Sequence, residues 1–175
     1  MGPNRLHVQV AALAASFALV TGGCGPGVGG TGTGEGLAAF GAAAASVCDS
    51  AFAEKLVCTA ATPGATPTGS QSVRYVDATR QLVLRIESNQ ATLDALCQRV
   101  QFSGDFGIAP GNASGFFGTY SISPSTAQTF ARLLVQRPDT GGDLRIELRD
   151  IDGHGVIAPV TLQAAPTPLP APGPC

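Results

Sequence analysis

The 175-residue sequence is poor in charge and in aromatic side chains, and these shortages exclude several classes of protein. Charged residues make up 13% of the chain, aromatic residues 6%, and there is no tryptophan. The net charge is −2, and lysine and arginine form no run, so we expect no nucleic-acid partner. No apolar stretch reaches the roughly 20 residues that a membrane-spanning helix requires.

Common catalytic and cofactor motifs are also missing. The sequence contains no C-x-x-C, which argues against a zinc site or a thioredoxin-like redox site, and no G-x-S-x-G nucleophile motif. Residues 27–32 do satisfy G-x-G-x-x-G, but no repeated strand–helix–strand pattern follows, and glycine continues at positions 34 and 36. We interpret this stretch as a flexible tether and expect no enzyme activity, no cofactor and no metal.

The N-terminal region has the pattern of an export signal. Residues 10–20 are apolar except for Ser16, which is the length of a signal-peptide core, and small residues then precede a cysteine in Val20-Thr21-Gly22-Gly23-Cys24. This segment resembles the lipobox of bacterial lipoproteins. The resemblance implies that Cys24 is lipidated with palmitate-type acyl chains and that the protein is anchored in the cell envelope. Gly25, in place of aspartate, implies the outer membrane; an ordinary secretory signal peptide is the alternative.

The composition divides the chain into five parts. We expect a signal peptide (1–23), a lipidated glycine-rich tether (24–36), a helical segment with a linker (37–71), a β-domain (72–163) and a proline-rich tail (164–175). The alanines at 42–45 favour a helix, and Phe52 and Leu56 would form its apolar face.

From residue 72 onward, apolar and polar residues alternate, which is typical of half-buried strands. Turn-forming residues such as Pro138–Gly142 separate the runs. The pattern predicts a mostly β fold, either an antiparallel sandwich or a small closed barrel of about seven or eight strands, preceded by the short Ala-rich helical segment. The expected strands are 73–77, 82–87, 99–106, 116–122, 129–136, 144–149 and 156–162.

Four cysteines remain when Cys24 is set aside, and an even number in an exported chain predicts two disulfides. One arrangement joins Cys48 to Cys58 and Cys97 to Cys175, which would attach the tail to the β-domain. The other joins Cys58 to Cys97 and leaves Cys175 free.

Three side chains are candidates for binding. Arg145 and Arg149 alternate with Glu147 along one strand, which indicates either cross-strand ion pairs or a strip that binds an anion or a protein partner. Phe116 and Phe117 point to opposite faces of their strand, so Phe117 is either exposed or lines a cavity.

His154 is the remaining feature that would suggest chemistry. It lies in Asp150-Ile151-Asp152-Gly153-His154-Gly155, which fits a general base beside a carboxylate, the start of a calcium loop, or a polar hairpin turn. The later ligands of a calcium loop are missing, and Asp-Gly and His-Gly pairs favour turns, so we interpret the segment as a turn.

These observations leave three hypotheses for function. The leading one is a lipid-anchored, non-enzymatic envelope protein that contacts the membrane through its anchor and binds an envelope protein, a glycan or an apolar ligand. The second is a lipocalin-like carrier with a cavity lined by Phe102, Phe106, Phe116 and Leu133. The third is an envelope hydrolase that uses His154.

Overall fold

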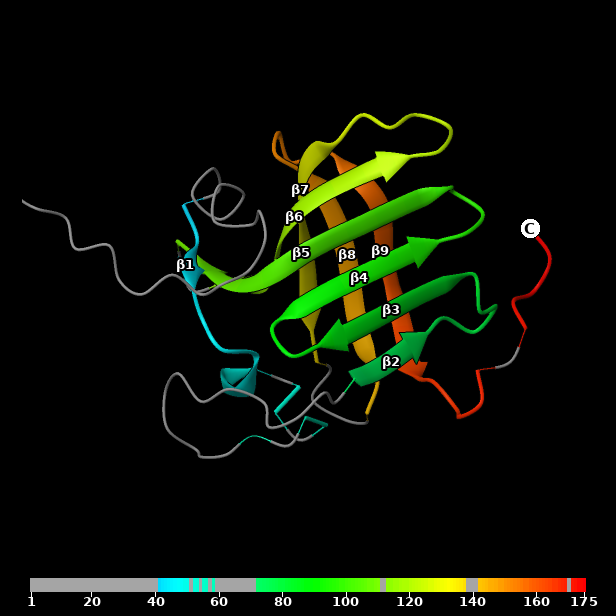
Figure 1. Ribbon diagram of the computed structural model, residues 1–175, viewed down its shortest axis with the longest axis horizontal. Coiled ribbons are helices and arrows are strands. Elements are labelled where there is room, and N and C mark those ends of the chain that lie inside the picture. The colour runs from blue at the N-terminus through cyan, green and yellow to red at the C-terminus, as the bar shows by residue number, and fades with distance from the viewer. Residues whose placement is uncertain are drawn as a thin grey trace, which may run out of the picture.

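The alternating residues form eight strands that curl into a closed antiparallel barrel (Figure 1). The structure, a computed structural model, describes residues 41–50, 52, 53, 55, 56, 58, 72–110, 113–137, 142–169 and 171–175. The expected signal peptide, Cys24 and the glycine-rich tether lie outside the described residues. In the described part, no helix is both long and apolar enough to cross a membrane.

Each strand of the barrel pairs with its neighbours in the sequence, and the last strand returns to the first. This up-and-down topology confirms the predicted mostly β fold and shows that the architecture is a closed barrel. The strands are β2 (Ser72–Val76), β3 (Leu82–Glu87), β4 (Gln90–Ala95), β5 (Val100–Ala109), β6 (Ala113–Ile122), β7 (Thr129–Gln136), β8 (Leu144–Asp150) and β9 (Gly155–Ala164).

Strand β4 is the strand that the sequence pattern did not indicate. Its buried positions are Ala91, Leu93 and Ala95, and the two small alanines weaken the apolar alternation. It follows β3 through the two-residue connection at 88–89, where Ser88 has a positive φ of 53°. A two-residue hairpin of this kind fixes the register of both strands.

Strands β5 and β6, each of 10 residues, bend together around a pair of glycines. Gly104 and Gly118 are directly opposite each other, and a Cβ added to Gly118 would lie only 1.9 Å from the Ser103 carbonyl oxygen. Only a residue without a side chain allows the two backbones to approach this closely. The glycine pair therefore allows the sheet to curve and close.

The prediction of an Ala-rich helix before the barrel is wrong for the described residues. The segment instead contains strand β1 (Ala43–Ala44), which pairs with β5, and the 3-10 turn η1 (Val47–Asp49). Asn89 determines this path, because its side chain accepts a hydrogen bond from the Val47 N–H (2.7 Å) and donates one to the Ala45 carbonyl (2.9 Å). These tertiary contacts outweigh the weak helical preference of alanine.

The N-terminal segment closes one end of the barrel. Val47, Phe52 and Leu56 are at most 1% exposed and belong to the same apolar core as the strands. The ring of Phe52 lies 6.2 Å from that of Tyr75 and 5.8 Å from that of Phe116, centroid to centroid. Phe52 thus plugs the barrel at the end that carries the β3–β4 turn.

Candidate functional site

The barrel wall is least continuous where β9 meets β2. The two strands share register pairs only at Tyr75 and Val76, whereas β5 and β6 pair along their full length. One further bond joins the Ala165 N–H to the Arg74 carbonyl (2.8 Å). Beyond it the chain leaves the sheet, so the start of β2 at Ser72 has no partner strand on this side among the described residues. We call this junction the seam.

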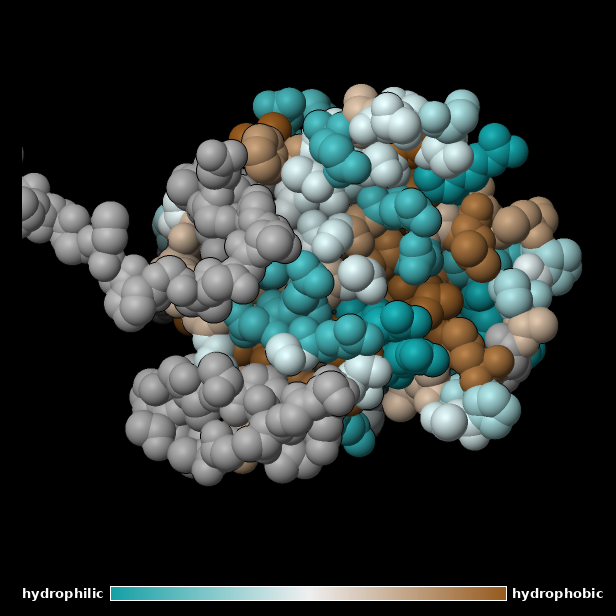
Figure 2. All heavy atoms as spheres, viewed as in Figure 1, coloured by the Kyte–Doolittle hydropathy of each residue, from teal (hydrophilic) through white to brown (hydrophobic). Residues whose placement is uncertain are grey.

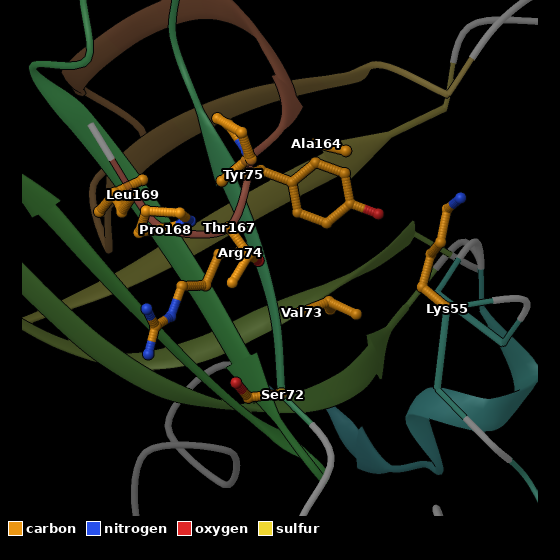
Figure 3. A pocket seen from close by; sticks show the side chains of 11 residues that line it. Lys55, Ser72, Val73, Arg74, Tyr75, Ala164, Thr167, Pro168 and Leu169 are labelled. Atoms are coloured by element: carbon orange, nitrogen blue, oxygen red, sulfur yellow. The ribbon is translucent and has the colours of Figure 1, made fainter.

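A cavity of about 610 Å³ occupies the seam, which is within the size range of small-molecule binding sites. Its walls come from three segments that are distant in the sequence, namely Lys55 of the N-terminal segment, β2 residues 72–75 and tail residues 164–169. Figure 3 shows these side chains around the start of β2. The closure of the barrel is what brings the three segments together.

Two charged side chains, both cations, are among the described residues that line the seam cavity. Lys55 and Arg74 are exposed, and neither side chain makes an ion pair or hydrogen bond within the described part of the chain. Arg85 lies opposite Arg74 on β3, and its guanidinium is 3.8 Å from the Glu87 carboxylate. Glu87 is thus paired with Arg85, and the described lining of the cavity carries positive charge.

The rest of the described cavity wall combines apolar side chains with the hydroxyl-bearing residues Ser72 and Thr167. Val73 and Tyr75 lie on one face of β2, and Tyr75 is 2% exposed. Figure 3 shows Lys55 on the same side of β2 as the Tyr75 hydroxyl, whereas Arg74 points to the opposite side, where Leu169 lies. A ligand in the seam would meet apolar surface between groups that can donate charged hydrogen bonds.

The tail that forms one cavity wall is attached at the other end of the barrel. The Gly173 N–H donates to the Thr79 carbonyl (3.0 Å), and the Gln81 side-chain amide donates to the Pro174 carbonyl. The disulfide from Cys97 to Cys175 then joins the C-terminus to the β4–β5 connection. The tail is therefore held at both ends of the span that covers the seam.

Asp77 organises the loop to which the tail is attached. Its carboxylate accepts hydrogen bonds from the N–H groups of Gln81 and Leu82, both at 2.7 Å, and from the hydroxyl of Thr79. Burial alone would raise the pKa of Asp77, but these hydrogen bonds outweigh it and lower the pKa below its ordinary value.

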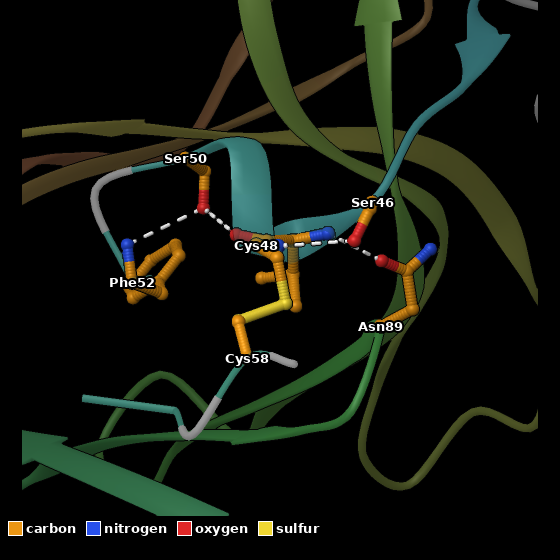
Figure 4. Close-up of a disulfide and its surroundings, with 7 residues drawn as sticks. Ser46, Cys48, Ser50, Phe52, Cys58 and Asn89 are labelled. Carbon is orange, nitrogen blue, oxygen red and sulfur yellow. Dashed lines mark hydrogen bonds between the residues drawn. A yellow bond between two sulfur atoms is a disulfide. The ribbon is translucent and has the colours of Figure 1, made fainter. Parts of the chain in front are cut away.

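The turn that carries Lys55 is held by the second disulfide, Cys48–Cys58 (Figure 4). Ser46 accepts a hydrogen bond from the Cys48 N–H at 3.2 Å and caps η1. The Lys55 N–H donates to the Phe52 carbonyl (2.9 Å), so the lysine is held one tight turn after the residue that plugs the barrel. The two predicted disulfides are thus Cys48–Cys58 and Cys97–Cys175.

The interior of the barrel is occupied by side chains. Phe102, Phe106, Phe116 and Leu133, which would line a carrier cavity, are each at most 3% exposed. Of five pockets lined by described residues, none is lined by Phe106, Phe116 or Leu133. These five pockets lie at the seam and on the surface.

The binding residues suggested by the sequence lie away from the seam cavity. Phe117 is fully buried, and no described pocket includes it. Arg145 is exposed on β8, and Arg149 lies 2.8 Å from Glu147, from the guanidinium Nη2 to the carboxylate oxygen. Arg149 therefore pairs with a glutamate of its own strand β8, whereas the sequence pattern suggested ion pairs between neighbouring strands.

His154 belongs to an exposed turn between β8 and β9. Asp150 accepts hydrogen bonds from the His154 N–H (2.8 Å), and its other oxygen lies 3.2 Å from the ring Nδ1. Burial alone would raise the pKa of Asp150, but these bonds and the charge of the ring lower it. Asp150, Asp152 and His154 lie close enough to share an ion, but the turn's own hydrogen bonds account for their arrangement.

A shallower groove of about 350 Å³ crosses the outer face of β4, β5 and β6. Thr92, Ser103 and Thr119 form a row of hydroxyls across it. Figure 2 shows this side of the molecule, where hydrophilic residues run across the middle of the face. The groove lies on an open sheet surface, whereas the seam cavity is bounded by three segments that are distant in the sequence. We therefore regard the seam cavity as the better candidate.

Comparison of the chain with protein-family models, with curated proteins and with solved structures returned no match. The candidate site therefore stands on geometry alone. Sequence reasoning did not single out Lys55 or Arg74, because neither belongs to a recognisable motif. The one available signal was that Lys55 is the only lysine in the chain.

Proposed function

We propose that this protein is a lipid-anchored, non-enzymatic envelope protein whose barrel binds a small molecule in the seam cavity. The lipobox-like segment ending at Cys24 supports the anchor. The observation that carries the binding role is the cavity of about 610 Å³ at the seam. Two disulfide-held segments form its walls, so the site is largely formed before a ligand arrives.

A lipocalin-like carrier function, with an apolar ligand inside the barrel, is the second candidate. The closed eight-stranded barrel favours it, because carriers of this kind use that architecture. In this chain, however, the ring of Phe52 lies against Phe116 where such a ligand would sit. An interior ligand would require the N-terminal segment to leave, whereas a ligand at the seam would not.

The binding role is tested by native mass spectrometry of the full chain purified from envelope membranes. We expect a small molecule to accompany the protein and to be lost from Ala164→Trp, since Ala164 lines the cavity. Ala158→Trp is the matched control, because Ala158 is exposed on the same strand and lines none of the described pockets. Equal ligand content in the two variants would refute the seam as the site.

The anchor is tested separately by Cys24→Ser. We expect this variant to move from the membrane fraction to the soluble fraction, because serine lacks the thiol to which the anchoring acyl chains would be attached. Unchanged membrane association of Cys24→Ser would contradict the lipid anchor and leave the binding role untouched.

A further inference from the structure

We propose that the ligand of the seam cavity is a small amphiphilic anion, with one negatively charged group on an apolar body. The inference rests on the proposed binding function and names the class of molecule bound. It follows from two independent properties of the cavity wall, its charge and its apolar surface.

The first property is the sign of the charge. Lys55 and Arg74 line the cavity, and the described lining residues include no aspartate or glutamate, although the whole chain has a net charge of −2. Neither cation has a side-chain partner within the described residues. A carboxylate, phosphate or sulfonate would supply the missing partner through charged hydrogen bonds.

The second property is the apolar surface beside these cations. Val73, Tyr75 and Leu169 contribute side chains, together with the prolines of the tail. Leu169 is 38% exposed, and a bound hydrocarbon would cover it. A fully polar anion would leave this surface unused, and a neutral lipid would leave both cations unpaired.

The inference is tested with the full chain as Cys24→Ser and four probes measured by calorimetry. The probes are decanoate, decyl phosphate, decanamide and inorganic phosphate. We expect decanoate and decyl phosphate to bind at one site, and decanamide and inorganic phosphate to bind at least tenfold more weakly (about 1.4 kcal/mol). Decanamide binding as tightly as decanoate, or inorganic phosphate binding as tightly as decyl phosphate, would overturn the proposal.

Two variants identify the cation that contacts the anion. We expect Lys55→Gln or Arg74→Gln, or both, to weaken decanoate binding by about tenfold, as for the loss of one charged hydrogen bond. Arg85→Gln is the control, because Arg85 lies opposite Arg74 but outside the cavity and should leave binding unchanged. If neither cavity variant changes affinity, the proposed role of charge is wrong.

The single lysine provides a measurement that needs no substitution. Lys55 is the only lysine, so acylation with an amine-reactive reagent can be followed by peptide mapping. Saturating decanoate should slow the acylation of Lys55, and decanamide should not. Decanoate could fail to bind and to protect Lys55, while the protein purified from envelope membranes carries a ligand that Ala164→Trp lacks. In that case the proposed ligand class is wrong, and the binding function stands.

Discussion

The ring of Phe52 packs against the ring of Phe116, with the centroids 5.8 Å apart and the planes tilted by 54°. Phe116 in turn makes an edge contact with Phe106 at 5.4 Å. A residue of the irregular N-terminal segment thus continues a stack of aromatic rings that begins inside the barrel. The contact connects the plug, the core and the turn that carries Lys55.

We expect Phe52→Ala to lower the free energy of unfolding by about 3–5 kcal/mol, because it removes a buried ring and leaves a cavity. Urea denaturation of the full chain measures the change. Ile151→Ala is the control, since Ile151 is 49% exposed and its truncation should cost far less. A loss below about 1 kcal/mol for Phe52→Ala would mean that the segment does not plug the barrel.

The two disulfides should differ in their contribution to stability. The chain-entropy model gives about 2.7 kcal/mol for Cys48–Cys58, with a separation of 10, and about 4.5 kcal/mol for Cys97–Cys175, with a separation of 78. We therefore expect the variant with serine at both Cys97 and Cys175 to be less stable in urea than the variant with serine at both Cys48 and Cys58. Peptide mapping of the unreduced protein checks the connectivity directly, and a Cys58–Cys97 peptide would contradict it.

Gly118→Ala should destabilise the barrel by about 3 kcal/mol or more, because its Cβ would overlap the backbone of β5. The matched control is Gly142→Ala, where an added Cβ meets nothing within 4 Å. Thermal unfolding of both variants decides the matter. Similar melting temperatures would show that β5 and β6 do not approach closely at this point.

Asp77 should make stability depend on pH in the acid range. Its folded-state pKa is lowered from the ordinary 3.8, so the stabilisation is complete above 3.8 and is lost as the pH falls through the lower folded value. We expect Asp77→Asn to be less stable than the parent at neutral pH, with the difference shrinking in acid. Urea titrations from neutral to acid pH measure it. A difference that does not change with pH would exclude the carboxylate charge as its cause.

The strand pattern was predictable wherever large apolar residues alternate with polar ones. Leu144, Ile146 and Leu148 point into the core as their alternation indicated. Strand β4 was not predicted, because alanine occupies two of its three buried positions and contrasts only weakly in hydrophobicity with the polar residues between them. The helical segment expected within 37–71 was wrong for its described residues for a different reason. Asn89 and the edge of β5 bind the backbone there, and a local sequence pattern cannot show such distant partners.

The candidate site was hidden from the sequence because its residues share no motif. Lys55, Arg74 and Leu169 come from three segments and meet only where the barrel closes. Conversely, Phe117 looked like a binding residue because it is aromatic and outward-facing by alternation. The structure buries it fully, a property that depends on what packs over the strand.

The sequence by itself determined that the chain forms an antiparallel β-domain with two disulfides. The alternation of apolar and polar residues is a property of short segments, and the number of cysteines can be counted directly. Only the tertiary structure decided that the sheet closes, which cysteines pair and where a cavity opens. Closure depends on how β9 meets β2 across the whole domain, and that junction is short because the tail leaves the sheet at Ala165. The seam cavity exists because this last junction of the barrel is incomplete.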